Sequence, residues 1–264
     1  MEADVRRLLT FPCGEDLLAG SLDGAAGPVG ILLVTGGTQT RIGSHRMYEH
    51  LAKSLAKQGF LCLRFDRRGV GDSSGDDPDF RGSGDDLKAA ADTLRQETKV
   101  ERIIGFGLCD GATTLALHGA NAGIHGAILV NPWLVEAEAG DMAPAAVRSH
   151  YRQRLFSLSA WKKLLSGGVN LGKLAGSLKK AGTATDGGLA DEAARGLRGM
   201  PAALILATGD NTAIAAVAEV KKSAFDGLIG WRREIHSDSH TFARPGDQES
   251  LNQAVLGALK ALTA

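Results

Sequence analysis

A five-residue stretch in the middle of the chain has the residue types and spacing of a nucleophile elbow. Residues 107–111 read Gly-Leu-Cys-Asp-Gly and follow the apolar segment 103–106. An elbow turns a strand sharply into a helix, so glycines two residues to either side of the nucleophile avoid clashes, and Gly107 and Gly111 fill those positions. The N–H groups that begin the helix would stabilise a thiolate. We therefore expect Cys109 to act as a nucleophile; the alternative is a small buried cysteine beside a tight turn.

The other two cysteines lack this setting. Cys62 lies within the apolar segment 60–63 and is expected to be inert core. Cys13 lies in a predicted polar turn at 13–16 and has no base near it in the sequence. Three cysteines cannot all pair, and no charged n-region followed by an apolar h-region opens the chain. These features predict a reduced, cytoplasmic protein.

A cysteine nucleophile needs a base to take its proton and a carboxylate to orient that base. In a fold with a nucleophile elbow, the chain order is nucleophile, acid, histidine, so both partners should follow Cys109. Asp210 comes directly after the apolar segment 202–207, where a short loop would aim its carboxylate into the site. We therefore expect Asp210 to be the acid. Its alternative role is to cap the helix that follows.

Two histidines lie on the predicted loop between the last strand and the last helix. They are His236 and His240, and we favour His240 as the base because it lies further out along the loop. Asp238 could orient His240 locally, but side chains two residues apart usually point away from each other, so Asp210 is the better acid. The remaining histidines are expected to serve at the surface or in packing: His45, His50, His118, His125 and His150.

The oxyanion of an acyl-transfer intermediate would need two backbone N–H donors. One should be the amide of Asp110, which follows the nucleophile. The other should come from the glycine-containing loop 35–39, where Gly37 or Thr38 is the expected donor. A phosphate-cradling loop is the alternative, but the sequence has neither a P-loop lysine pattern nor a GxGxxG run there.

The polar segment 66–75 reads Asp-Arg-Arg-Gly-Val-Gly-Asp-Ser-Ser-Gly. We interpret it as a structural network of Arg and Asp side chains that braces the loop after the second parallel strand, and assign it no catalytic role. No group of histidines, cysteines and carboxylates has metal-ligand spacing. The sequence therefore predicts neither a metal nor a cofactor.

Alternating apolar and helical segments predict the elements that position these residues. Short apolar runs are typical of buried parallel strands, and the segments between them have helical spacing. An N-terminal hairpin is predicted at 5–9 and 17–22, strands at 29–34, 60–65, 102–106, 126–130, 202–207 and 228–235, and helices at 44–58, 85–96, 110–120, 213–222 and 247–262. This alternation indicates an α/β fold with a mostly parallel, doubly wound sheet.

The stretch between Asn131 and Pro201 is too long for a loop. Its segments 142–158, 160–180 and 189–197 look helical and partly basic, which predicts a helical cap inserted between two strands. The predicted organisation is a core formed by 1–133 and 201–264 with a cap at 134–200. The alternative is a peripheral helical layer that does not contact substrate.

The apolar fraction and the net charge indicate which kinds of molecule the chain could bind. The chain has 264 residues, 44% of them apolar, which suits one domain with an insertion. Its 30 basic and 30 acidic residues give a formal net charge of zero, so nothing indicates nucleic acid or an anionic membrane surface. The apolar runs are too short to insert into a membrane. We expect a small or modestly polar substrate.

Several motifs together resemble a known family. They lie at 36–46, 64–73, 107–110 and 129–133, and the likeness continues into the predicted cap at 150–151 and 161–167. These stretches resemble the exosortase-A-system-associated hydrolases of the first type, α/β-hydrolases encoded in bacterial exopolysaccharide and protein-sorting loci.

The resemblance implies an α/β-hydrolase fold and assigns nucleophile, acid and base to Cys109, Asp210 and His240. Two departures are visible. Thr38 stands where the family pattern has proline after the two glycines, and the loop around Asp210 is one residue shorter.

Together, these observations predict a hydrolase that cleaves a small-molecule ester or thioester through an acyl-cysteine intermediate. The first alternative is an acyltransferase, in which an alcohol or amine replaces the water that releases the acyl group. A second, from a different class, is a catalytically silent binding module that keeps the pocket as a receptor.

Overall fold

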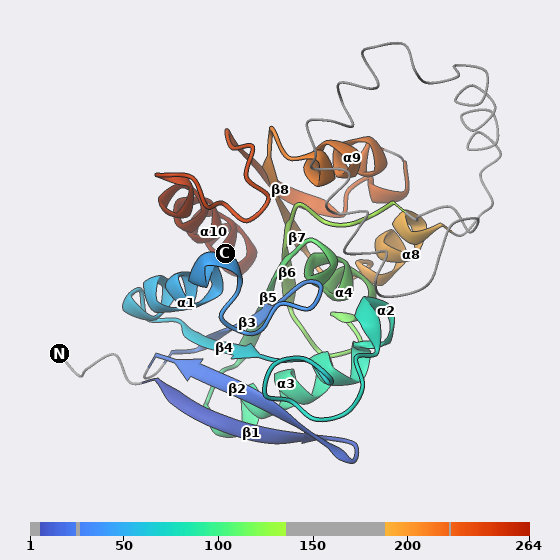
Figure 1. The fold of residues 1–264 in the computed structure, drawn as a ribbon. Helices are drawn as coiled ribbons and strands as arrows, with labels where there is room; N and C mark the ends of the chain where they lie inside the picture. The colour runs from blue at the N-terminus through green and yellow to red at the C-terminus, as the bar shows by residue number, and fades with distance from the viewer. Residues whose placement is uncertain (1–5, 25–26, 136–187, 222) are drawn as a thin grey trace, which may run out of the picture.

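The computed structural model describes residues 6–24, 27–135, 188–221 and 223–264. Its centre is one eight-stranded sheet with the order β1-β2-β4-β3-β5-β6-β7-β8 (Figure 1). The strands are β1 (Arg7–Cys13), β2 (Asp16–Asp23), β3 (Val29–Val34), β4 (Leu61–Phe65), β5 (Arg102–Leu108), β6 (Gly126–Val130), β7 (Ala202–Ala207) and β8 (Ile229–Ile235). The hairpin strands β1 and β2 pair antiparallel, as does β2 with β4, and all other neighbours are parallel. The predicted α/β class and mostly parallel sheet are confirmed.

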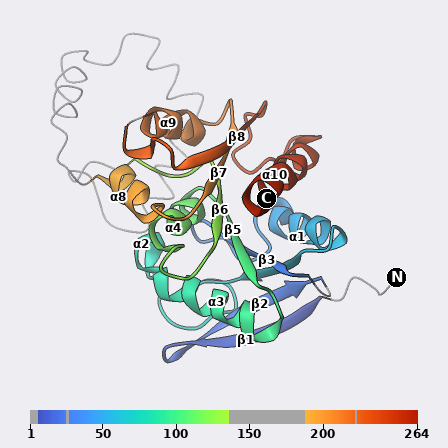
Figure 2. The same ribbon diagram turned by 180° about the vertical axis from the view of Figure 1, so that it is seen from behind.

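Helices cover both faces of the sheet (Figures 1 and 2). The helical elements are η1 (Ser44–Arg46), α1 (Met47–Lys57), α2 (Asp79–Gly82), α3 (Gly84–Glu97), α4 (Asp110–His118), α8 (Leu189–Gly196), α9 (Asn211–Val220), η2 (Ser223–Phe225) and α10 (Asp247–Thr263). Helices α1 and α10 cover one face, which we call the α1 face. Helices α3, α4 and α8 cover the other, the α3 face.

Alternation along the central strands divides their apolar side chains between two cores. In β3, Ile31 and Leu33 pack on the α1 face, whereas Leu32 and Val34 pack on the α3 face. All four side chains are fully buried. Burial on both sides explains why these strands read as continuous apolar runs in the sequence. The same burial fixes the strand ends that carry the candidate site.

The predicted helix at 44–58 begins later than expected. Residues 44–46 form the 3-10 turn η1, and α1 starts at Met47. His45 and Arg46 have φ values of 53° and 59°, and an α-helix cannot pass through residues in this left-handed region. The helical spacing of 44–58 was therefore correct only from residue 47 onward.

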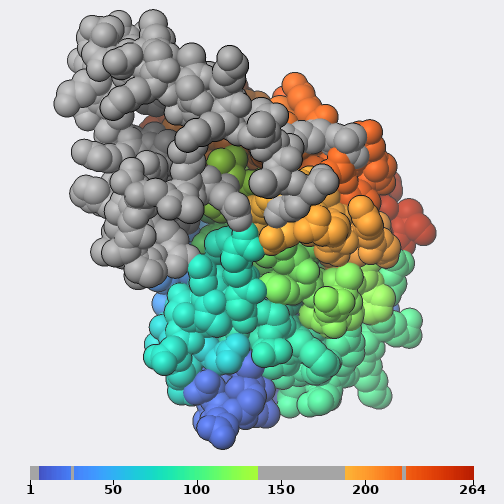
Figure 3. All heavy atoms as spheres, turned by 90° about the vertical axis from the view of Figure 1, so that its right-hand side faces the viewer, coloured from blue at the N-terminus to red at the C-terminus, as the bar shows by residue number. Residues whose placement is uncertain are grey.

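Part of the predicted cap can be described. The helix expected at 189–197 is present as α8, and it packs against α4 of the core. A Cβ at Gly196 would lie 2.2 Å from the Ala116 carbonyl oxygen, so the two helices touch backbone to backbone. Arg81 of α2 also pairs with Glu192 of α8 at 2.5 Å, and Figure 3 shows the two helices side by side on this face. The segments 142–158 and 160–180 lie outside the described residues, and the domain boundaries stay predictions.

Among the described helices, none is both long and apolar enough to cross a bilayer.

Candidate active site

Cys109 occupies the turn between β5 and α4. Its φ and ψ are 59° and −124°, a conformation that residues with a side chain rarely adopt. Hydrogen bonds on both sides hold it there. The Cys109 amide donates to the Val130 carbonyl at 3.0 Å, and the Cys109 carbonyl accepts from the Ala112 and Thr113 amides at 3.1 Å. Neighbouring secondary structure therefore imposes the strained turn.

The glycines that flank this turn are required by close backbone approach. A Cβ at Gly107 would lie 2.5 Å from the carbonyl of Gly111, and one at Gly111 would lie 2.4 Å from the carbonyl oxygen of Val34. Both distances are shorter than a Cβ tolerates. The expected reason for glycine at both positions is therefore present in the structure.

The three cysteines are all buried, but their settings differ. Burial raises the pKa of the Cys62 thiol well above its ordinary value. Burial also raises the pKa of Cys13, as does the nearby carboxylate of Asp86. Cys13 is the last residue of β1 and faces the core, so it is not a turn residue as predicted; the turn begins at residue 14. Only Cys109 stands at the N-terminus of a helix.

Asp210 and His240 meet beside the ends of β7 and β8. The Nδ1 atom of His240 lies 3.0 Å from Oδ2 of Asp210, and the two side chains are 14% and 1% exposed. The same Oδ2 accepts from the amide of Ala213 at 3.1 Å, so Asp210 also caps α9. The predicted helix cap is therefore present, and the same oxygen contacts His240. A carboxylate at Nδ1 fixes the histidine tautomer in which Nε2 can accept a proton.

The other acidic and basic candidates on this loop point elsewhere. The side chain of His236 is exposed and lies 3.4 Å from the Thr208 hydroxyl. Asp238 accepts two hydrogen bonds of 3.0 Å from the Arg244 guanidinium, which lowers the pKa of this carboxyl. Both side chains therefore have hydrogen-bond partners other than Asp210 and His240.

Buried groups that sequence reasoning missed hold the His240 loop. The Ser237 hydroxyl donates to Asp247 at 2.5 Å and accepts from the amide of Ser239 at 3.0 Å. Phe242, two residues after His240, is fully buried with φ of 53°. The pattern of Phe242 two residues after a loop histidine was visible in the sequence and could have indicated an anchor.

The loop after β3 lies against the elbow. Its residues 36–39 form a tight turn in which the Gln39 amide donates to the Gly36 carbonyl at 3.3 Å, and Gly37 has φ of 58°. A Cβ at Gly36 would lie 2.3 Å from Oδ1 of Asp110 and 2.6 Å from the Leu108 carbonyl oxygen. The structure thus places Gly36, the residue before Gly37, against Asp110, the residue after Cys109.

Arg67 links the polar segment 66–75 to this loop. The Arg67 side chain is 3% exposed; its Nη2 donates to the Gly37 carbonyl and its Nη1 donates to the Ser83 hydroxyl at 3.1 Å. In a trans peptide the carbonyl and the N–H point in opposite directions. Since Arg67 holds the Gly37 carbonyl, the Thr38 N–H points away from Arg67.

The rest of segment 66–75 forms the predicted bracing network. Asp66 accepts from the amides of Arg41 at 2.5 Å and Asp72 at 3.1 Å. Arg68 pairs with the fully buried Asp86 at 3.0 Å. The network also holds the loop after β3 through Arg67, which the sequence did not reveal.

Trp133, which follows β6, is tied to the elbow through its backbone. Its amide donates to the Cys109 carbonyl at 3.3 Å, and its carbonyl accepts from the Thr113 hydroxyl at 2.6 Å.

Across the described part of the chain, no cluster of histidine, cysteine and carboxylate side chains could hold a metal ion.

Comparison with protein families and solved structures identifies relatives of this chain. A family model described as serine aminopeptidase, S33, matches residues 29–174, which is more than half of the chain. No curated protein matches the sequence.

Solved structures match along nearly the whole chain. An esterase from Pyrococcus furiosus superposes with a TM-score of 0.68 at 14% identity, covering 97% of this chain and 92% of that one. The α/β hydrolase GrgF from Penicillium sp. sh18 gives 0.67 at 17% identity over 98% and 100%. Dienelactone hydrolase from Anabaena variabilis gives 0.63 at 15% identity over 97% of each chain. At these identities, the likeness shows the α/β-hydrolase fold.

Proposed function

From the premise that this chain belongs to the serine aminopeptidase S33 family of α/β hydrolases, we propose that it cleaves ester or thioester bonds through an acyl-cysteine intermediate on Cys109. The observation that carries the proposal is the 3.0 Å contact between His240 Nδ1 and Asp210 Oδ2. It lies at the carboxyl edge of the parallel strands β5 to β8, the same edge at which Cys109 occupies a strained turn before α4. A base oriented by a carboxylate is the arrangement that activates a weak nucleophile.

The reaction follows from these positions. His240 Nε2 takes the proton from the Cys109 thiol, and the thiolate attacks the acyl carbonyl carbon. The tetrahedral intermediate collapses to an acyl-cysteine as His240 returns the proton to the departing alcohol or thiol. A water molecule then gives a proton to His240 and attacks the acyl carbon. Collapse of this second intermediate releases the carboxylic acid and restores the Cys109 thiol.

The oxyanion in both intermediates would accept hydrogen bonds from the amides of Asp110 and Thr38. The orientation of the Gly37–Thr38 peptide supports Thr38 over Gly37, because Arg67 holds the Gly37 carbonyl on the opposite side. Proline at position 38, as in the resembled family, would have no N–H to donate, so a Thr38 donor would be a feature in which this chain departs from that pattern.

Relatives favour ester chemistry for the substrate. Structural relatives include an esterase and a dienelactone hydrolase, and another is Est1E from Butyrivibrio proteoclasticus with ferulic acid bound. The family model carries the name of a peptidase, so amides belong in any substrate panel. The proposed helical cap at 134–200 would cover the substrate, and a place in exosortase or exopolysaccharide systems rests on the resemblance of the sequence motifs.

Intact-mass analysis of the full chain after exposure to activated esters, thioesters and aminoacyl amides tests the proposal. We expect an adduct with the mass of one acyl group, absent in Cys109→Ala and present in Cys62→Ala, because Cys62 is a buried core thiol. Free acid as the final product supports hydrolysis, and acylation of an added alcohol or amine supports acyl transfer. An adduct that persists in Cys109→Ala contradicts the assignment of the nucleophile.

A further inference from the structure

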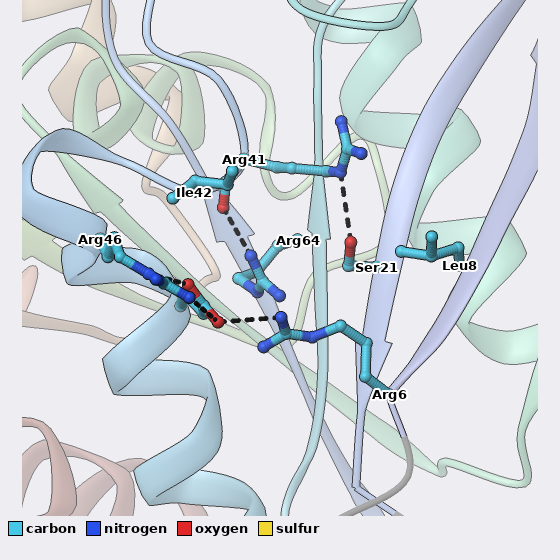
Figure 4. A pocket seen from close by; sticks show the side chains of 8 residues that line it. Arg6, Leu8, Ser21, Arg41, Ile42, Arg46 and Arg64 are labelled. Atoms are coloured by element: carbon cyan, nitrogen blue, oxygen red, sulfur yellow. Dashed lines mark hydrogen bonds and ion pairs between the residues drawn. The ribbon is translucent and has the colours of Figure 1, made fainter.

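A concave site lies over β1, β2 and β4, beside the N-terminus of α1 and apart from the candidate active site (Figure 4). Its volume is about 390 Å³. Four arginines line it, Arg6, Arg41, Arg46 and Arg64, and none of them belongs to the proposed catalytic machinery. We call this site the arginine pocket.

One buried carboxylate under the arginine pocket serves two guanidinium groups. Asp23 is 1% exposed and accepts from Arg64 Nε at 3.0 Å and Nη2 at 2.9 Å. It also accepts from Arg6 Nε at 2.7 Å. Arg64 itself is 1% exposed, and β-strand alternation places it on the α1 face with Cys62.

A second buried carboxylate is shared by three cations. Glu49, 3% exposed, accepts from Arg46 Nε at 2.6 Å and Arg6 Nη1 at 2.9 Å, and it lies 3.3 Å from Lys53 Nζ. The Arg46 hydrogen bond, reinforced by Arg6 and Lys53, holds the pKa of this carboxyl well below its ordinary value although burial raises it. Figure 4 shows the Arg6 and Arg46 side chains approaching from opposite sides.

The charges in this cluster do not balance. Three arginines and one lysine surround the two carboxylates, which leaves an excess of two positive charges. Arg41 does not change this count, because its guanidinium pairs with Asp66 and with Asp72 at 2.8 Å. In a chain of zero net charge, such a local excess within a concavity attracts anions.

One donor in the cluster also lacks an acceptor. Arg6 Nη2 is buried and makes no hydrogen bond with any described residue. A buried charged donor is costly when unpaired, so Arg6 would gain from an oxyanion that reached this atom. Two apolar residues, Leu8 and Ile42, also line the pocket, and they are 69% and 44% exposed.

We propose that the arginine pocket binds a small organic dianion of the phosphate monoester class, with its phosphate on Arg6 and Arg46 and its apolar group over Leu8 and Ile42. The two negative charges match the local excess, and guanidinium forks suit the tetrahedral oxygens. The volume corresponds to roughly a dozen water-sized groups, which exceeds what a bare phosphate fills. The proposal does not depend on the proposed hydrolase activity.

Isothermal titration calorimetry of the full chain with phenyl phosphate, at fixed ionic strength, tests the inference. We expect saturable binding that weakens at least fivefold in Arg46→Gln. In this variant Glu49 keeps Arg6 and Lys53 as partners. The matched control is Arg232→Gln, an arginine on β8 paired with Glu234 at 2.7 Å, which should leave the affinity unchanged. Inorganic phosphate should bind more weakly than phenyl phosphate, and phenol should not bind.

Three results would overturn the inference: no saturable heat with millimolar phenyl phosphate, equal weakening in both variants, or equal binding of phenol.

The chain also carries acidic residues Glu2 and Asp4 just before Arg6. Unchanged affinity in E2Q/D4N supports an external ligand, whereas a tenfold tightening would assign the pocket to the chain's own carboxylates. Thermal unfolding of each variant identifies any loss of fold.

Discussion

Buried carboxylates do different work in two regions of this molecule. In the candidate active site, Asp210 is 1% exposed and meets the imidazole of His240. In the arginine pocket, Asp23 and Glu49 are equally buried but meet guanidinium groups. Imidazole gains and loses a proton near neutral pH, whereas guanidinium stays charged. A buried carboxylate can therefore orient an imidazole that exchanges protons, or it can hold guanidinium groups whose charge is permanent.

The two regions also differ in how their backbone is held. The elbow keeps Cys109 at positive φ between β5 and α4, and the adjoining loop is clamped by Arg67. The arginine pocket spans three neighbouring strands. Leu8 of β1 pairs with Ser21 of β2, which in turn pairs with Arg64 of β4. The first region concentrates backbone strain at Cys109, and the second concentrates charge around an open volume. Substitutions should therefore affect turnover in the first region, and stability or ligand affinity in the second.

The largest expected effect is at the nucleophile. Cys109→Ala should abolish turnover, and Cys109→Ser should lower kcat by roughly 10⁴-fold or more, because a hydroxyl is far less acidic and relies wholly on the base. Circular dichroism should show an unchanged fold, since Cys109 contributes only a small side chain to its core. Steady-state kinetics on an activated thioester measures the effect. Full activity of Cys109→Ala on every accepted substrate would remove this cysteine from the mechanism.

The second largest effect separates the two loop histidines. His240→Ala should reduce kcat by about 10²–10⁴-fold, the usual contribution of a general base. His236→Ala is the matched control, because its exposed side chain reaches only the Thr208 hydroxyl, and it should retain most activity. Kinetics of both variants on one ester decides the assignment, and a larger loss in His236→Ala would reverse it.

A smaller effect should come from the clamp on the oxyanion loop. Arg67→Gln removes the charged donor to the Gly37 carbonyl and should lower kcat by about 10-fold or more with little change in KM, since a misoriented donor loses part of the roughly 10²–10³-fold that an oxyanion hydrogen bond supplies. Added guanidinium should partly restore kcat in Arg67→Ala. Equal changes in KM and kcat without rescue would indicate a purely structural role for Arg67.

The sequence predicted the fold because its signals were local. Segments 126–130 and 202–207 are buried on both faces of the sheet, and such strands must be apolar throughout. The spacing of Gly107 and Gly111 around Cys109 likewise follows from steric limits inside one turn. Patterns of this kind are visible wherever a short stretch of chain determines its own geometry.

What the sequence did not reveal depends on distant contacts. Arg67 and Gly37 are 30 residues apart, and no local pattern connects an arginine after β4 with a carbonyl after β3. The left-handed turn at His45 and Arg46 interrupts a stretch whose apolar spacing was helical. Cys13 looked like a turn residue because its neighbours are polar, yet it ends β1 facing the core. Tertiary packing decided each of these features.

The smallest expected effect concerns stability in the arginine pocket. The pKa of Glu49 is lowered in the folded protein, so its ion pairs stabilise the fold fully above the unfolded-state pKa of about 4.3, and this stabilisation is lost progressively as pH falls from there toward the lower folded-state pKa. Glu49→Gln should therefore lower the free energy of unfolding at pH 7 by about 1.5–3 kcal/mol, the range for hydrogen bonds to charged groups. The difference from the parent should shrink between about pH 5 and pH 3. Urea unfolding across this range measures it, with Glu15→Gln at an exposed turn as the control. A difference that stays constant down to pH 3 would mean that Glu49 contributes packing and not charge, and the contrast with Asp210 would then fail.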